Sequence, residues 1–290
     1  MRHTCLLAMT VSLASSPPAS PPAANSGARV AVTVPAATAV QFDGDLNEEV
    51  WRRAPVITGF KQRDPRDGAP ATFETEARVA YDDHAMYVAV QANDPDPAQL
   101  IGLRTRRDEH SPSDWIRVVV DSFHDRRTAY EFAVNPVGVK QDGYWFNDGN
   151  NDQGWDAVWD VAVSRTDRGW RAEFRIPLSQ LRFKPSENAT FGFAVVRHIG
   201  RLNETSTWPL LSKNVNGYVS SFGDLTGLNL TDSAKRLELV PYLVGDLKGS
   251  TLFVVWQQGR EGTLDRGTFN LGRDVGGAFD APARNVFLVK

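Results

Sequence analysis

The stretch GWRAEFRIPL, residues 169–178, carries the pattern that decides the fold class. Apolar and charged side chains alternate along it without interruption. The apolar ones are Trp170, Ala172, Phe174 and Ile176, and the charged ones between them are Arg171, Glu173 and Arg175. Successive side chains of a β-strand point to opposite faces of its sheet, so the stretch predicts a strand with one apolar and one wet face. An antiparallel sheet that is packed on one side only is typical of this pattern.

The same alternation recurs earlier in the chain. Residues 77–94 and 114–134 each predict two strands joined by a turn. Helix is scarce: FDGDLNEEVWRRAP, residues 42–55, offers one or two turns, with Asp45 as the cap and Glu48 completing a capping box. Many short strands separated by turn signals predict an all-β protein, either a sandwich or a barrel.

Composition and charge narrow the class of protein. The chain has 290 residues, 41% of them hydrophobic and 23% charged, as in an ordinary globular protein of one or two domains. The formal net charge is −3 and the sequence has no basic stripe, so we expect no nucleic-acid partner. No run of 18 apolar residues is present, so no transmembrane helix is predicted.

The N-terminus predicts export. A short basic segment precedes the apolar run CLLAMTVSLA, residues 5–14, and small residues follow it, as in a signal peptide; a disordered tail is the alternative. Residues 15–28 are rich in Pro, Ala and Ser and predict a disordered linker. Cys5, the only cysteine, begins the apolar run rather than following it, so we expect no lipid anchor. The mature protein would then lie in the periplasm, in the outer membrane or outside the cell, without a thiol.

A series of motifs follows in a fixed order. They are FDGDLNEEVW, YDDHAMYVAV, a strand ending at Val120–Asp121, TAYEFAVNPVGV, WDAVWDVAV, GWRAEFRIPLSQLRF and SSFGDLTGL. As an ordered set over residues 38–230, they resemble the family 9 carbohydrate-binding module, as found before an outer-membrane β-barrel in uncharacterised bacterial proteins. The resemblance implies an antiparallel, jelly-roll-like β-sandwich that is supported by calcium and grips a sugar between aromatic rings.

The sequence pattern changes in the last part of the chain. RLELVPYLVG resembles the first strand of such a barrel, whereas STLFVVWQQGR and NVFLVK resemble strands near its end. Since these segments nearly adjoin here, we expect three or four strands, with most of a barrel missing. The predicted organisation is a signal peptide and linker at 1–28, the carbohydrate-binding-module-like sandwich at 29–232 and a truncated barrel-like tail at 233–290.

The family's sugar contacts do not carry over residue by residue. The resemblance places its two sandwiching aromatic residues near Ser111 and Asn216, and its acidic and basic contacts near Arg117 and Ala133. None of these four residues has the expected chemistry. The resemblance therefore supports the fold more strongly than it supports a particular sugar site.

Other aromatic side chains are candidates for a sugar site. Flat aromatic faces cover the C–H groups of a sugar, while a few polar groups bind its hydroxyls. The predicted carbohydrate-binding residues are Trp115, Trp145, Trp155 and Tyr218. Packing in the core is the alternative for each of them. Trp159 alternates with Val161 and Val163, so we assign it to the core.

The polar loop NDGNNDQGWDAVWD, residues 147–160, is also a candidate calcium site. Asp148, Asn150 and Asp152 have the alternating spacing with which an EF-hand begins. Gln153 and Trp159 stand where an EF-hand needs Gly and Glu, so only a looser calcium site is predicted. The alternative is a solvated turn, which Asp, Asn and Gly favour on their own.

Catalysis has little support in the sequence. The histidines lack metal-binding spacing, and no G-x-S-x-G motif is present. The first hypothesis is therefore a non-catalytic module, exported to the cell envelope, that binds a polysaccharide or oligosaccharide in polysaccharide recognition or carbohydrate catabolism. The second is a soluble structural or interaction domain of an outer-membrane protein, with an envelope partner and no sugar site; the third is a hydrolase acting on O-glycosyl bonds. An exposed aromatic pair would favour the first hypothesis, and burial of all four candidates the second.

Overall fold

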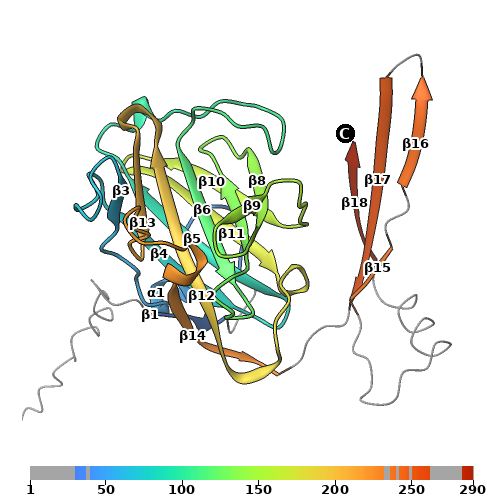
Figure 1. Ribbon diagram of the computed structural model, residues 1–290, viewed down its shortest axis with the longest axis horizontal. Coiled ribbons are helices and arrows are strands. Elements are labelled where there is room, and N and C mark those ends of the chain that lie inside the picture. The colour runs from blue at the N-terminus through green and yellow to red at the C-terminus, as the bar shows by residue number, and fades with distance from the viewer. Residues whose placement is uncertain are drawn as a thin grey trace, which may run out of the picture.

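The computed structural model describes residues 30–36 and 40–231, together with four strands within residues 236–289. The predicted signal peptide and linker at residues 1–28 lie outside the described residues. Nearly all the regular structure is β-strand (Figure 1). Among the described residues, no helix has the length and apolar character needed to cross a membrane.

Two sheets form the main body. The larger sheet has the strand order β1-β14-β12-β6-β7-β8-β9, and β13 and then β3 extend it beside one part of β12. Its strands are β1 (Val30–Val32), β3 (Lys61–Asp64), β6 (Trp115–Asp121), β7 (Ala129–Val134), β8 (Lys140–Phe146), β9 (Asn150–Asp152), β12 (Ser186–Ile199), β13 (Glu204–Trp208) and β14 (Gly223–Leu230). The smaller sheet has the order β10-β11-β5-β4-β2. Its strands are β2 (Val34–Pro35), β4 (Thr75–Tyr81), β5 (Ala85–Asn93), β10 (Asp160–Thr166) and β11 (Gly169–Pro177).

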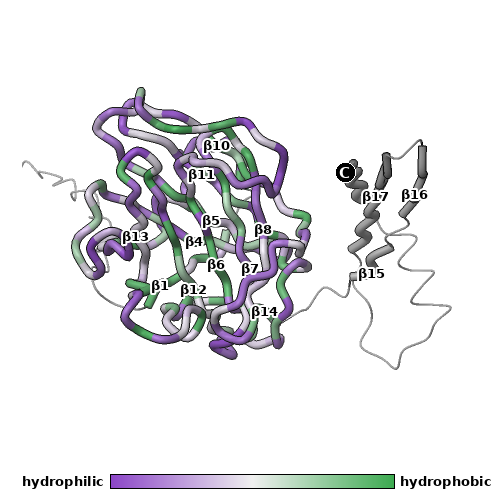
Figure 2. Tube along the Cα trace, turned by 45° about the horizontal axis from the view of Figure 1, so that its top comes forward, coloured by the Kyte–Doolittle hydropathy of each residue, from purple (hydrophilic) through white to green (hydrophobic). Residues whose placement is uncertain are grey.

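The two sheets enclose one hydrophobic core. The apolar residues predicted from alternation in β11, Trp170 through Ile176, are all buried in it. Trp159 joins the sheets: its ring stacks on Phe174 of β11 with centroids 5.8 Å apart and meets Phe132 of β7 edge-on at 5.3 Å. Apolar segments run along these strands, while polar ones dominate the connecting loops (Figure 2). The predicted all-β sandwich and the core position of Trp159 are confirmed.

Two pairings depart from a purely antiparallel arrangement. β1 pairs with β14 in parallel, and β2 pairs with β4 in parallel. The N-terminal segment therefore crosses from the edge of one sheet to the edge of the other within a few residues. Alternation reveals that a segment is a strand, but it carries no information on which neighbour the strand joins.

The outer face of the smaller sheet is covered rather than wet. Helix α1 (Glu49–Arg53) places Trp51, 2% exposed, on a cluster that includes Ala89 of β5. Glu173, which alternation assigned to the wet face, is consequently 0% exposed. The predicted capping box is also wrong, because the helix begins at Glu49, beyond the reach of Asp45, and Glu48 makes no side-chain capping bond.

The outer face of the larger sheet has its own apolar cover. Leu211, Val219 and Phe222, from the segment between β13 and β14, pack on Val119 and Val196 of the sheet. The short 3₁₀ helices lie at Pro97–Gln99, Leu178–Gln180, Gly200–Leu202 and Val219–Ser221. The covering segment leads the chain across this face and brings Tyr218 onto it.

The tail contains a third, antiparallel sheet. Its strands are β15 (Arg236–Leu239), β16 (Tyr242–Leu247), β17 (Ser250–Glu261) and β18 (Ala283–Val289). The long strand β17 pairs with each of the other three. The three or four strands expected in this region are therefore present, while their origin in a barrel stays a prediction.

Candidate functional site

A cluster of aromatic and charged side chains lies on the outer face of the larger sheet. Arg117, Glu131 and Trp145 project from the adjacent strands β6, β7 and β8. They alternate with core residues such as Phe132, so they point away from the core. Tyr218 reaches the same place from the covering segment. The structure thus brings together two of the four predicted aromatic residues.

The members of this cluster are in direct contact. The rings of Trp145 and Tyr218 lie 4.1 Å apart between centroids and are tilted by 31°. The Trp145 indole N–H donates to Glu131 Oε2 over 2.7 Å. Arg117 Nε lies 3.4 Å from Glu131 Oε1, and the two side chains are 24% and 15% exposed. An aromatic pair is therefore joined to an ion pair, and all four side chains are partly exposed.

Burial and nearby charges keep Tyr218 and His198 uncharged at neutral pH. Burial, together with the Glu131 carboxylate, raises the pKa of the Tyr218 hydroxyl. Burial lowers the pKa of His198, on the next strand, and the positive charges of Arg117 and His110 lower it further. At neutral pH the surface therefore offers a phenol, an uncharged imidazole and an ion pair, which are groups that hydrogen-bond to hydroxyls.

Asp148 fixes Tyr218 in this position. Its Oδ1 accepts hydrogen bonds from the backbone N–H groups of Tyr218 and Ser220, and its Oδ2 accepts one from the Ser220 hydroxyl. Its carbonyl accepts two more, from Tyr218 and Val219. A side chain at Gly217 would collide with the Asp148 carboxylate, so glycine permits the close approach. Asp148 is thus a clamp between the β8–β9 turn and the covering segment.

This finding changes the interpretation of the predicted calcium site. Both carboxylate oxygens of Asp148 already accept hydrogen bonds, and Asp152 Oδ1 accepts one from Gly154 N–H. Asn150 lies in the short strand β9. As they stand, Asp148, Asn150 and Asp152 do not offer a set of free oxygens to one cation. Calcium at these three residues stays a prediction without a supporting contact.

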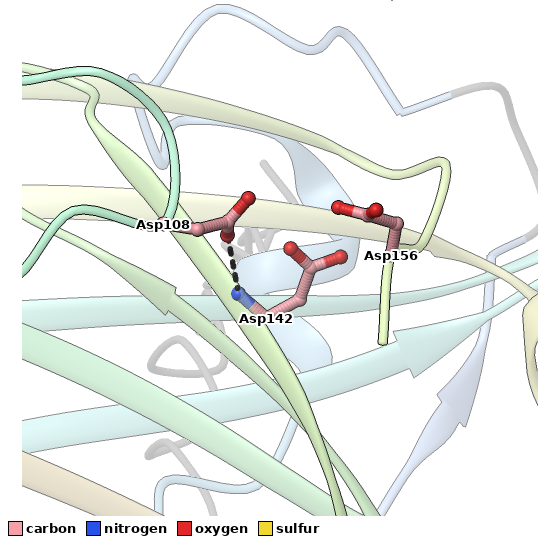
Figure 3. A group of neighbouring side chains, drawn as sticks. All are labelled: Asp108, Asp142 and Asp156. Carbon is pink, nitrogen blue, oxygen red and sulfur yellow. Dashed lines mark hydrogen bonds between the residues drawn. The ribbon is translucent and has the colours of Figure 1, made fainter. Parts of the chain in front are cut away.

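The structure instead assembles a different acidic cluster. Asp108, Asp142 and Asp156 point toward one another, with one carboxylate oxygen of each within 4.8 Å of the others (Figure 3). The Arg107 guanidinium already provides a positive charge, since its Nη2 bonds to both oxygens of Asp142 at 2.8 and 2.6 Å. Burial raises the pKa of Asp108 to about 6, and the Asp142 carboxylate adds to the effect. Sequence reasoning missed this group because its members are far apart along the chain.

The other two predicted aromatic residues do not add to this surface, although the Trp115 ring lies beside Arg117, with the guanidinium carbon 6.0 Å from its centroid. Trp155 packs on the core side of the larger sheet, 5.0 Å from Tyr130 and 6.0 Å from Phe132 between ring centroids. It therefore does not share a face with Trp145. Trp115 lies on the outer face but is only 1% exposed, and its indole N–H donates to the Ser111 carbonyl. A ligand has no access to that ring, so the prediction of Trp115 as a sugar platform is wrong in this structure.

The structure shows how the positions indicated by the family resemblance lie relative to each other. Arg117 and Ala133 are direct partners in the β6–β7 register, so an acid and a base at these positions would face each other. Here the acid is Glu131, two residues along β7, and it pairs with Arg117. The ion pair is therefore present on the same two strands with its members exchanged.

Comparison with known proteins gives the family. The sequence profile described as carbohydrate family 9 binding domain-like matches residues 42–203, more than half of the chain. No curated protein sequence matches. The chain is similar to a solved family 9 carbohydrate-binding module from Caldicellulosiruptor kristjanssonii in complex with cellotriose, with 18% identity and a TM-score of 0.48, over 68% of this chain and 92% of that one. A module of this family from the same organism in complex with glucose is similar with 17% identity and a TM-score of 0.48, over 70% of this chain and 98% of that one. The profile match confirms the family that the ordered motifs predicted: the chain belongs to the carbohydrate family 9 binding domain-like family.

Proposed function

We propose that the sandwich is a non-catalytic module that binds an oligosaccharide or polysaccharide on the outer face of its larger sheet. The observation that carries the proposal is the contact of Trp145 and Tyr218 with the Glu131–Arg117 ion pair. Aromatic surface and convergent polar groups are the two requirements of a sugar site. Both are met by side chains on the outer face, three of them directed there by alternation along their strands and Tyr218 by the covering segment.

The geometry also restricts how a sugar would bind. With ring centroids 4.1 Å apart, Trp145 and Tyr218 leave no room for a pyranose between them. The sugar would lie against the accessible margin of the stacked pair, with its hydroxyls toward Glu131, Arg117 and the Tyr218 hydroxyl. This differs from a grip between two separate rings, which the family resemblance implies.

Glucose-based ligands are the first to test. The two similar modules named above were solved with cellotriose and with glucose. Cello-oligosaccharides and a panel of soluble polysaccharides would be titrated into the full chain by calorimetry and by affinity gel electrophoresis. We expect saturable binding with one site per chain.

Conservative variants separate this site from nonspecific binding. Glu131→Gln and Tyr218→Phe keep the shape of each side chain but remove a charge or a hydroxyl. We expect each to weaken binding about tenfold, which corresponds to one lost hydrogen bond of about 1.4 kcal/mol. Glu187→Gln, at an exposed position of β12, and Tyr144→Phe, on the core side of β8, are the matched controls and should bind normally. Equal affinity in all four variants would contradict the proposed site.

A second function is favoured by two observations. The closed Trp145–Tyr218 stack and the buried Trp115 are also what an interaction domain without a sugar site would show. Failure of the wild-type chain to bind any sugar in the panel would support that function and exclude the first. Trp145 and Tyr218 are only partly buried, so the condition that would favour the second function, burial of all four aromatic residues, is not met.

Export to the cell envelope and a role in carbohydrate catabolism belong to the same proposal. They rest on the apolar segment at residues 5–14 and on the sugar chemistry above. Fractionation of a bacterial host that expresses the C-terminally tagged full chain tests the export. Recovery of uncleaved protein in the cytoplasm alone would contradict it.

A further inference from the structure

A cavity of about 370 Å³ lies between the segment that leads into β6 and the turn that joins β7 to β8. Residues 104, 105 and 107 line it from the first segment, and residues 137–140 from the turn and the start of β8. Lys140 Nζ lies 5.0 Å from the centroid of the Trp159 ring, so the Lys140 side chain is on the core side of β8, opposite to Trp145. The cavity is therefore separate from the aromatic cluster on the outer face.

Asn135 holds the two walls of the cavity together. Its side chain is 0% exposed, and its Oδ1 accepts hydrogen bonds from Val137 N–H at 3.1 Å and from Val139 N–H at 2.9 Å. Its Nδ2 donates to the Leu103 carbonyl at 2.8 Å. A buried amide that is satisfied on both sides fixes the turn against the facing segment. The cavity is thus preformed, which lowers the cost of binding a ligand.

Every charged residue that lines the cavity is basic. Arg107 is paired with Asp142, but its bonds use Nε and Nη2, and Nη1 takes part in none of them. Lys140 Nζ donates to the Trp159 carbonyl at 2.7 Å, a neutral group that leaves the charge of the ammonium uncompensated. The Arg104 side chain is exposed and has no ion pair or hydrogen bond within the described part of the chain. Two positive charges therefore border the cavity without an ion-pair partner among the described residues.

Two further observations indicate that an acceptor is missing here. Thr105 Oγ1 is shielded from solvent and has no hydrogen-bond partner among the residues that the structure describes, whereas buried polar atoms of native proteins are almost always satisfied. Burial lowers the pKa of Lys140, and the positive charge of Arg107 lowers it further, even though Asp160 and two other carboxylates act in the opposite direction. A bound anion would accept hydrogen bonds from these groups and stabilise the ammonium.

We propose that this cavity binds the carboxylate of a single acidic sugar unit, such as glucuronate or galacturonate. A guanidinium matches the two oxygens of a carboxylate in one plane, which suits Arg104 at the rim. The volume is near the lower end of the range for small-molecule sites, roughly 300–1,000 Å³, so a single sugar unit is the size to expect. Val137 and Val139 supply apolar surface for the C–H groups of the ring. The proposal is independent of the outer-face site.

Ligand-observed NMR on the full chain tests the cavity, with glucuronate and galacturonate as the probes. We expect saturable binding of at least one of them. Glucose has a hydroxymethyl group in place of the carboxylate of glucuronate, so it should not displace the acid. Arg104→Met removes an exposed charge and should weaken binding at least about tenfold, as expected for a lost hydrogen bond between charged groups. Lys140→Met should do the same, with its thermal midpoint measured to show that it folds.

Two variants serve as matched controls. Arg106→Met removes an equally exposed charge two positions away that does not line the cavity, so it should bind the acid as the wild type does. Tyr218→Phe alters the outer face only and should also bind it normally, which separates this site from the one proposed above. Absence of binding of both acids by the wild type would overturn the proposal, as would undiminished binding in Arg104→Met. Displacement of the acid by equal concentrations of glucose or of inorganic sulfate would also overturn it, since the site would then not select an acidic sugar.

Discussion

Replacement of Asp148 by alanine is the most informative test of how the aromatic surface is built. The substitution removes three side-chain hydrogen bonds to Tyr218 and Ser220. Bonds to a charged acceptor contribute about 1.5–3 kcal/mol each when the donors stay buried, but Ser220 is exposed and its donors can turn to water. Asp148 also has φ 66°, a left-handed conformation that costs alanine about 1–2 kcal/mol. We expect Asp148→Ala to lower the free energy of unfolding by about 3 kcal/mol.

Urea denaturation followed by tryptophan fluorescence measures this loss. Asp148→Asn keeps one acceptor oxygen and tolerates the left-handed conformation, so its loss should be about 1 kcal/mol. Asp152→Ala, at the end of the adjacent strand β9, is the control, since its carboxylate accepts a single local bond from Gly154. Its loss should stay below about 1 kcal/mol. If Asp148→Ala and Asp152→Ala lose equal amounts, the clamp does not hold the covering segment and the reasoning is refuted. Sugar affinity should fall in Asp148→Ala and persist in Asp152→Ala.

Four further perturbations test other parts of the fold. Burial, with the Glu48 charge nearby, raises the pKa of Glu173 from 4.5 to about 7, so the folded state binds a proton that the unfolded state releases. The resulting stabilisation is complete below pH 4.5, amounts to about 3 kcal/mol and is lost as pH rises through 7. Glu173→Gln should remove that slope from the pH dependence of urea midpoints, and a slope of the same size in the variant would exclude Glu173 as its source. Arg107→Met leaves the 0% exposed Asp142 side chain without its positively charged partner and should lower the free energy of unfolding by about 3–5 kcal/mol in the same denaturation assay. Arg106→Met, at an exposed position, should change it by less than about 0.5 kcal/mol. Gly169→Ala places a Cβ 2.1 Å from the Ala92 carbonyl oxygen at φ 131° and should lower the free energy of unfolding by more than about 3 kcal/mol. Gly149→Ala, with open space around it, should be tolerated. Comparable thermal midpoints in the two variants would argue against the tight β5–β11 contact. Deletion of residues 237–290 should leave the thermal midpoint of the sandwich nearly unchanged, and loss of a cooperative transition would mean that the tail completes the core.

The core was predictable because its pattern is local. Phe174 and Ile176 could be assigned to one face from their own strand, since side chains alternate with a period of two. Trp159 followed by the same argument from Val161 and Val163. In each case, residues within a few positions of one another contain all the information that is needed.

The candidate site was less predictable because its contacts join distant segments. Trp145 and Trp155 lie close in sequence, yet the turn through β9 places them on opposite faces of the larger sheet. The residues that the Asp148 clamp joins, Asp148 and Ser220, lie 72 positions apart. An Asp- and Asn-rich loop is equally typical of a calcium site and of a solvated turn, so its composition did not reveal the clamp. Alternation also assigned Glu173 to solvent, because one strand cannot reveal that α1 will cover it.

The parallel pairing of β1 with β14 has a mechanical consequence. Val30 lies opposite Asp224 and Val32 opposite Thr226, so the first strand of the sandwich runs in the same direction as the last. A pull between the start of β1 and the end of β14 acts along the two strands in opposite directions, so all the hydrogen bonds between them bear the force at once. These bonds must break together, whereas a hairpin that is pulled from its open end loses its hydrogen bonds one at a time. The sandwich should therefore resist extension between residues 30 and 230 more strongly than a pull that peels β9 from its outer edge.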